Sequence, residues 1–355
     1  MLIKKIKKYL GKINFIEDAT RESRERLNRI EEENRKLSDR LLLLSNTDLF
    51  SMYANDSFRD TCLPKLSTQY GLVPSTKWED SNNRIELSQP YACTSMICNQ
   101  EFLDSPIAQY WSQKIGDGNP VYHRKRWELI YICQSLWERD CLKEGKKGIV
   151  FGVGEECLPD VFASMGCHIL ATDLNINESS AKGWAATNQN AGGNLEKLRR
   201  KKICDTETFY SHVSYRDVNM NDIPEDIKGY DFCWSTCAFE HLGSLKHGLD
   251  FVKNSLNTLK PGGIAVHTTE YNIYSNEATL ELKDLSLYRR KDMEQLIRDL
   301  TDAGHYVYPM DWHLGTSVVD HFIDLPPYQK TPMHLRLAVD RFPCTSIGII
   351  IQKKR

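Results

Sequence analysis

Several features are scarce or missing in this chain of 355 residues, and each absence bears on what the protein can be. No apolar run approaches 18 residues, so the sequence predicts no membrane-spanning helix. The net charge is only −2, so the overall charge gives no indication of a nucleic-acid partner. The first residues, MLIKKIKKYLGKI, lack the continuous apolar stretch and the cleavage site of a secretory signal. We therefore expect a cytoplasmic protein.

The eleven cysteines include no C-x-x-C pair. Cys133 and Cys233 fall in segments with the pattern of a buried helix and a buried strand. The closest local pairs, Cys93/Cys98 and Cys233/Cys237, have no histidines at the spacing of a structural metal site. The pattern indicates reduced thiols rather than a disulfide framework, and we predict no metal. Internal repeats and low-complexity tracts are also missing.

The most informative segment that is present runs from Gly148 to Asn175. A short apolar run leads to Gly152 and Gly154, which let the backbone turn sharply and approach a ligand. An apolar stripe with helical spacing follows and consists of Leu158, Val161, Phe162 and Met165. A second strand then ends at Asp173, where a carboxylate can accept hydrogen bonds from ribose hydroxyls. The order of strand, glycine turn, helix, strand and acid predicts a nucleoside-cofactor site.

The following segments continue the alternation of strands and helices. A third strand is expected at 213–215, ending at Asp217, and a fourth at 230–236. A helix over 245–259 leads through LKPGG into a fifth strand, GIAVHTTEYN. A helix that ends at Gly304 precedes two late strands, HYVYPMDWH and CTSIGIIIQKK, expected to form an antiparallel edge. This order predicts an α/β protein.

From Arg124 to Lys354 the chain resembles the class I S-adenosylmethionine-dependent methyltransferases. The matching segments are GVGEE, ATDLN, RDVNMNDIP, YDFCWSTCAFEHLGS and LKPGGIAVHTTEYN. The resemblance implies a Rossmann-like, seven-stranded sheet with helices on both faces and S-adenosyl-L-methionine as cofactor. The chain departs from the family pattern at Glu156, which replaces the last glycine of G-x-G-x-G, and at Phe151, where an acid often stands.

The resemblance also implies where the cofactor binds. Gly152 and Gly154 would pass under its methionine part, Asp173 would hold the ribose, and Asp217 with Val218 would meet the adenine. The full set of expected cofactor-binding residues is Gly152, Gly154, Asp173, Leu174, Asp217, Val218 and Ser235.

Two other functions stay open. A dinucleotide-dependent oxidoreductase is one, although Cys157 stands where the dinucleotide fingerprint has its third glycine. The other is a coiled-coil scaffold whose methyltransferase-like domain is inactive, an alternative that the Glu156 departure keeps open.

The acceptor is expected to be a small molecule or a glycan. The carboxyl-terminal part resembles bacterial methyltransferases linked to surface-glycan assembly, which implies methylation of a sugar hydroxyl. A hydroxyl acceptor needs a base, and His241, directly after the fourth strand, is the catalytic candidate. His267 falls in an apolar strand and is expected in the core, while His305 starts a late strand at the opposite edge. His241 could also be architectural.

Three regions are expected along the chain. Residues 1–46 carry a heptad pattern from Leu2 to Leu44, with Asn34 at an a position, that predicts a self-associating coiled coil. A single amphipathic helix packed on the enzyme domain is the alternative, and a weak membrane-surface contact of the basic first residues stays open. Residues 47–122 are an irregular linking or lid region, and 123–355 form the methyltransferase domain. Its first helix, about 123–142, is expected to pack in the core.

Overall fold

The computed structural model describes residues 93–118, 121–175, 190–200, 202–325, 328 and 333–355. The predicted coiled coil and residues 47–92 of the predicted linking region lie outside this part of the chain. Among the described residues, no helix combines the length and the apolar character that crossing a bilayer requires.

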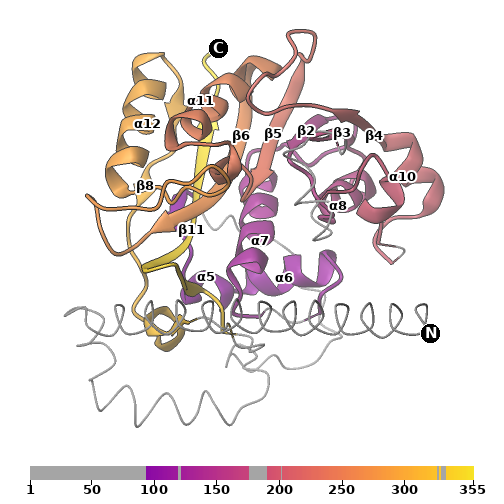
Figure 1. The fold of residues 1–355 in the computed structure, drawn as a ribbon. Coiled ribbons are helices and arrows are strands. Elements are labelled where there is room, and N and C mark those ends of the chain that lie inside the picture. Colours follow the sequence, from indigo (N-terminus) through magenta and orange to yellow (C-terminus); the bar gives the residue numbers. More distant parts are fainter. Residues whose placement is uncertain (1–92, 119–120, 176–189, 201, 326–327, 329–332) are drawn as a thin grey trace, which may run out of the picture.

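The centre of the fold is a twisted sheet (Figure 1), and its main strands occur along the chain in the order that the sequence predicts. In spatial order these are β4 (Val213–Asp217), β3 (His168–Asp173), β2 (Lys147–Phe151), β5 (Tyr230–Thr236), β6 (Leu259–Asn272) and β11 (Phe342–Gln352). The first five are parallel and β11 runs antiparallel to β6. The chain thus reverses its direction of travel across the sheet at β2, with β3 on one side and β5 on the other. In sheets of this kind ligands bind beyond the carboxyl ends of the strands at such a switch point.

The described sheet has eleven strands rather than the predicted seven, because five short strands extend it beyond β11. Three of them pair one after another along the outer edge of β11: β10 (Arg336–Val339), β1 (Ser95–Ile97) and β7 (Tyr306–Val307). Two more, β8 (Met310–Asp311) and β9 (Ile323–Asp324), pair with β1 and β10. The expected late strand over 305–313 is therefore two short pieces. An unpaired strand edge invites association with other chains, and these pieces cover the edge of β11.

Helices cover both faces of the sheet, as expected. α6 (Pro106–Lys114), α7 (Arg124–Trp137) and α8 (Leu158–Ser164) contribute to one apolar core with Val150 of β2. α11 (Leu245–Ser255) and α12 (Arg290–Asp302) contribute to a second core with Phe151 of the same strand. Successive residues of a strand point to opposite faces, which is why neighbouring residues of β2 belong to different cores. A short helix, α10 (Thr206–His212), precedes β4.

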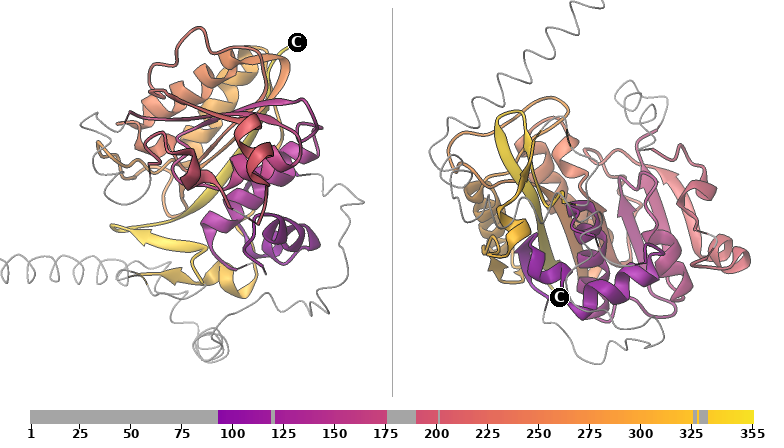
Figure 2. Two further views of the ribbon diagram at one scale, coloured as in Figure 1. Left: turned by 90° about the vertical axis from the view of Figure 1, so that its right-hand side faces the viewer. Right: turned by 90° about the horizontal axis from the view of Figure 1, so that it is seen from below.

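Residues 93–118 show no helix or strand period in the sequence, yet the structure gives them regular elements. They form β1, the short helix α5 (Gln100–Leu103) and α6. Side-chain caps begin both helices, with Asn99 accepting from the Phe102 N–H and Ser105 from the Ala108 N–H. Figure 2 shows from two further directions that these indigo and purple elements lie beside the yellow carboxyl-terminal strands.

The expected core positions of the helix before β2 are confirmed. Trp127, Ile130, Tyr131 and Cys133 are buried, whereas the fifth expected position, Trp137, is half-buried and packs against the edge of the same core. The helix itself begins at Arg124 and ends at Trp137, earlier than the expected end near residue 142. Similarly α11 ends at Ser255, and a 3-10 turn, η3 (Leu256–Thr258), completes the expected segment.

Candidate functional site

A cavity of about 520 Å³ lies beyond the carboxyl ends of β2, β3 and β5, a size typical of small-molecule sites. Most of the expected site residues line it: Gly152, Gly154, Asp173, Leu174, Val218 and His241. Further lining residues include Lys125, Glu156, Met220, Cys237, Ala238 and Lys283. The structure therefore brings the glycine turn, the acid after β3 and the candidate base to one cavity.

The turn after β2 depends on its glycines. Gly152 and Gly154 have φ angles of 65° and 54°, in the left-handed region that disfavours other residues. A Cβ atom on Gly152 would also lie 2.8 Å from the Cβ of Ala238. The turn is anchored to β3, because the Val153 N–H donates to the Thr172 carbonyl at 2.9 Å and the Gly154 N–H donates to Asp173 Oδ2 at 2.9 Å.

Asp173 is held in place by this turn and by its own neighbour. Its Oδ2 accepts from Gly154, and its Oδ1 accepts from the Leu174 N–H at 2.8 Å. Burial raises the pKa of the carboxyl to about 6, although these two N–H donors act in the opposite direction. Each carboxylate oxygen has a second lone pair, so Asp173 can still accept a hydrogen bond from a ligand hydroxyl in the cavity.

Two expected cofactor residues do not line the cavity in the described part of the chain. Asp217 lies opposite Asp173 in the pairing of β3 and β4, and its Oδ2 accepts from Asn175 Nδ2 at 2.7 Å. Ser235 is buried on the other face of β5, where its hydroxyl and His267 Nδ1 form a 2.8 Å hydrogen bond. The structure thus does not bring these two side chains to the cavity with the other expected residues, and their contacts with the cofactor stay predictions. Val218, next to Asp217, does line the cavity.

Glu156 is a cavity residue whose role the sequence pattern did not indicate. It replaces a family glycine, and its Oε1 accepts a 2.7 Å hydrogen bond from Trp234 Nε1. Burial raises its pKa to about 7, more than the hydrogen bonds to its carboxylate lower it. An ionisable carboxyl that titrates near neutrality in a cavity is a common mark of a functional site. The only signal in the sequence was the departure from G-x-G-x-G.

The walls near β4 and the following loop are largely apolar. Leu174, Val218 and Met220 line this part, and Val218 is buried and bonded through its N–H to the Asp173 carbonyl at 2.8 Å. The amides of Asn219 and Asn221 lie at the same wall. Such a wall suits a flat heteroaromatic ring with polar edges.

The structure places the three candidate histidines in three different environments, as the sequence suggested. His267 is buried, its ring nitrogens contact the hydroxyls of Ser235 and Ser255, and burial lowers its pKa to about 3, which confirms a core histidine. His305 accepts from the Lys354 N–H at 3.2 Å, beside a late strand, and does not line the cavity among the described residues.

His241 lies at the cavity on the short 3-10 turn η2 (Phe239–His241). Its Nδ1 is 2.7 Å from the Asp284 carbonyl oxygen. A carbonyl can only accept, so Nδ1 carries the proton and Nε2 is the basic nitrogen of the neutral ring. His241 Nε2 is 3.9 Å from Glu240 Oε1.

A group of buried charges lies behind the cavity wall formed by Cys237. Arg124 of α7 contacts Glu128, Glu270 and the thiol of Cys237, the last at 3.2 Å. Cys237 has a φ of 48°, and its N–H donates to Thr268 of β6. No residue of this group was selected from the sequence as a site residue.

No protein-family model matches the sequence. No curated protein matches it either. The solved structures that match it include several methyltransferases, some of them named as S-adenosylmethionine-dependent. One is a candidate sarcosine dimethylglycine methyltransferase of Galdieria sulphuraria, 16% identical with a TM-score of 0.30, where the match covers 50% of this chain and 52% of that protein.

Two others are matched over a larger share of their length. An S-adenosylmethionine-dependent methyltransferase of Clostridium acetobutylicum is 10% identical with a TM-score of 0.37, over 65% of this chain and 92% of that protein. The CcbJ methyltransferase of Streptomyces caelestis is 11% identical with a TM-score of 0.36, and the match covers 62% of this chain and 88% of that protein. Because these identities and TM-scores are low, the cavity itself has to carry any assignment of activity.

Proposed function

We propose that the protein binds S-adenosyl-L-methionine in this cavity and transfers its methyl group to an acceptor. One observation carries the proposal. The Gly152/Gly154 turn, the Asp173 carboxylate and an apolar wall line one cavity at the switch point of the sheet. The cofactor, when bound, supplies a methyl group made electrophilic by its sulfonium. The protein then has only to hold the cofactor and place a nucleophile in line at about 3 to 3.5 Å.

The lining residues match the parts of this cofactor. Asp173 would accept from the ribose hydroxyls, and the wall of Leu174, Val218 and Met220 would contact the adenine. The glycine turn would pass beneath the methionine part. Glu156, on the same turn, would pair with the α-ammonium group of the cofactor. It would thus replace the acid that often precedes the first glycine in the family, since Phe151 occupies that position here and is buried in the core.

The alternative cofactor, a dinucleotide, fits this turn less well. Glu155 and Glu156 place two carboxyl groups at the turn where a pyrophosphate would have to bind. Cys157, at the position of the fingerprint's third glycine, is buried just before α8. Since phosphate sites are built from N–H groups and positive charge, the chemistry of this turn favours a cofactor without phosphate.

We propose a hydroxyl as the acceptor, and specifically a sugar or glycan hydroxyl. His241 would be the general base, because it lies at the cavity with Nε2 as its basic nitrogen. Its proton acceptance would turn the acceptor hydroxyl into a better nucleophile as the new carbon–oxygen bond forms. The sugar part of the proposal rests on the resemblance of the carboxyl-terminal segments to surface-glycan methyltransferases.

Calorimetric titration of the purified full-length chain with S-adenosylmethionine and with NAD tests the cofactor. Binding of the first alone supports the proposal, and binding of NAD alone would replace it by an oxidoreductase. Binding of neither would favour the inactive scaffold. Transfer of radioactive methyl from the cofactor to a panel of sugars, glycans, amines and carboxylic acids then tests the acceptor class. Labelling of an amine or a carboxylic acid only would refute the hydroxyl assignment.

A further inference from the structure

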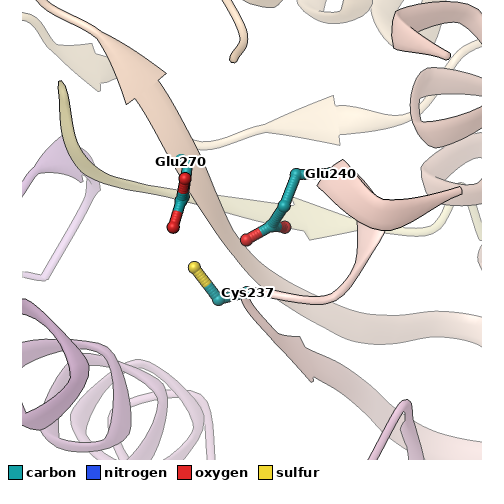
Figure 3. A group of neighbouring side chains, drawn as sticks. All are labelled: Cys237, Glu240 and Glu270. Carbon is teal, nitrogen blue, oxygen red and sulfur yellow. The ribbon is translucent and has the colours of Figure 1, made fainter. Parts of the chain in front are cut away.

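Three ligand-type side chains meet behind the cavity, and neither their spacing in the sequence nor the proposed methyl transfer explains them. They are Cys237, Glu240 and Glu270, whose sulfur and carboxylate oxygen atoms all lie within 4.8 Å of one another. Figure 3 shows the three side chains directed toward a common point. Cys237 and Glu240 come from the loop after β5 and from η2, and Glu270 comes from β6.

Two of the carboxylate oxygens at this point lack hydrogen bonds. Glu240 and Glu270 are 0% and 6% exposed, and neither Glu240 Oε1 nor Glu270 Oε2 has a hydrogen-bond partner among the described residues. Their other oxygens are occupied, since Glu240 Oε2 accepts from Thr269 at 2.9 Å and Glu270 Oε1 contacts Arg124. His241 Nε2, at 3.9 Å from Glu240 Oε1, is beyond hydrogen-bond range. A buried charged oxygen without a partner costs more than the 1–3 kcal/mol of an ordinary lost hydrogen bond.

The nearby glutamate Glu128 provides a contrast. Its Oε1 accepts from Arg124 and Ser346, and its Oε2 accepts from Thr268 at 3.3 Å. The fold therefore satisfies a buried carboxylate on α7 completely, yet leaves one oxygen without a hydrogen bond on each of the two carboxylates that lie beside the Cys237 thiol. Buried charges in proteins are paired or coordinate metals.

The charges in this region leave room for a divalent cation. Arg124 and Lys125 contribute two positive charges, and the carboxylates of Glu128, Glu240 and Glu270 contribute three negative charges. A coordinating thiol is deprotonated, which adds a fourth. A divalent cation then brings the sum to zero. Arg124 Nη1, at 3.2 Å from Cys237 Sγ, already contacts the sulfur as a charged donor.

We propose that Cys237, Glu240 and Glu270 bind one divalent cation of the zinc class. One sulfur and two carboxylate ligands favour zinc over magnesium or calcium, which prefer oxygen ligands throughout. Ligand atoms of a tetrahedral zinc ion lie about 3.5 Å apart given metal–ligand distances near 2.0–2.3 Å, so small side-chain rotations would close the observed separations. Three protein ligands leave the fourth position to a water or a ligand, and Cys237 borders the cavity through which one can enter.

Zinc binding by the full-length chain, first stripped of metal with a chelator, tests this site. Calorimetry should show a site that Glu240→Gln and Cys237→Ser each weaken at least about a hundredfold, since even outer-shell changes cost 10–100-fold. Cys133→Ser, which alters a buried thiol in the core around α7, should leave zinc binding unchanged. Equal zinc binding by wild type and both site variants would show that other groups bind the ion and would overturn the proposal. Lack of zinc binding by the wild type would do the same.

Cobalt(II) provides a readout on the wild-type chain that does not depend on whether a variant folds. A cobalt–thiolate charge-transfer band in the near ultraviolet is expected on one equivalent of metal, and its absence would refute thiolate coordination. Measuring S-adenosylmethionine affinity on the same samples separates this inference from the proposed function. Metal binding without cofactor binding would support the metal site and refute the methyltransferase assignment. Cofactor binding without metal binding would refute the metal site and leave the methyltransferase assignment standing.

Discussion

The Glu156 carboxyl provides the sharpest test of how the cavity binds its cofactor. Glu156→Gln keeps the shape of the side chain and an oxygen that can accept from Trp234 Nε1, but it removes the negative charge. Loss of a charged hydrogen bond costs about 1.5–3 kcal/mol. We therefore expect the variant to bind S-adenosylmethionine about ten- to a hundredfold more weakly at pH 7.4.

The pH dependence of S-adenosylmethionine affinity tests the same pairing in a second way. The pKa of Glu156 is raised to about 7 by burial, with Lys125 and Glu128 of α7 and Trp234 of β5 as its neighbours. Pairing needs an ionised carboxyl and a protonated α-amino group, whose pKa is about 7.8. Affinity should fall as pH drops through the pKa of Glu156 and also as pH rises through that of the amine. With these two values, the doubly charged pair is about sixfold rarer at pH 6 than at pH 7.4.

Isothermal titration calorimetry from pH 6 to pH 9 measures both limbs. The variant should lose the acidic limb due to Glu156 and flatten the alkaline limb, because without the carboxylate charge the site no longer favours the protonated amine. Asp173, with a pKa of about 6, adds only about a twofold change at pH 6, and it does so in both proteins. Glu155→Gln is the matched control, because the neighbouring Glu155 carboxylate pairs with Lys197 at 2.8 Å. An unaltered acidic limb in Glu156→Gln would refute the pairing.

Three further predictions concern the proposed roles of other residues. Asp173→Ala should weaken S-adenosylmethionine binding by about 1.5–3 kcal/mol, and calorimetry showing an unchanged affinity in a folded variant would remove Asp173 from the site. His241→Ala should lower methyl-transfer turnover by about two to four orders of magnitude with cofactor affinity unchanged; near-normal turnover would make His241 architectural. The heptad pattern of 2–44 predicts that a chain beginning at Asp48 has a lower oligomeric mass by light scattering than the full chain, and equal monomeric masses would favour intramolecular packing instead.

The part of the site that could be predicted from sequence is the part that is local. Gly152, Gly154 and Asp173 lie within one strand–turn–helix–strand unit, where backbone requirements and periodicity act over short distances. The strand pattern also placed His267 correctly in the core. Ser235 shows the limit of this reasoning, because side chains alternate along a strand and an error of one residue reverses the face. Its neighbour Thr236 lines the cavity, while Ser235 contacts His267.

The charged group behind the cavity could not be predicted in this way. Arg124 is 113 residues from Cys237 and 146 from Glu270 in the sequence, and only the packing of α7 against the sheet brings them together. The short strands beside β11 were missed for a related reason. β7 and β8 have two residues each, too few to show an alternating pattern. Their pairing with β11 and β1 is decided by the tertiary structure.

The outer edge of β11 has a consequence for how the chain can fold. Its partners β1, β7 and β10 come from residues 95–97, 306–307 and 336–339, whereas β11 itself comes from residues 342–352 and so follows all three in the chain. During translation, about 250 further residues must be synthesised after β1 before its partner β11 exists. Contacts of such high sequence separation slow folding and prolong the exposure of apolar segments. A chain cut just before α7 would lose β1 permanently and leave Ile347 and Gly348 with unpaired backbone groups at a sheet edge. Self-association through that edge is the expected result of such a truncation.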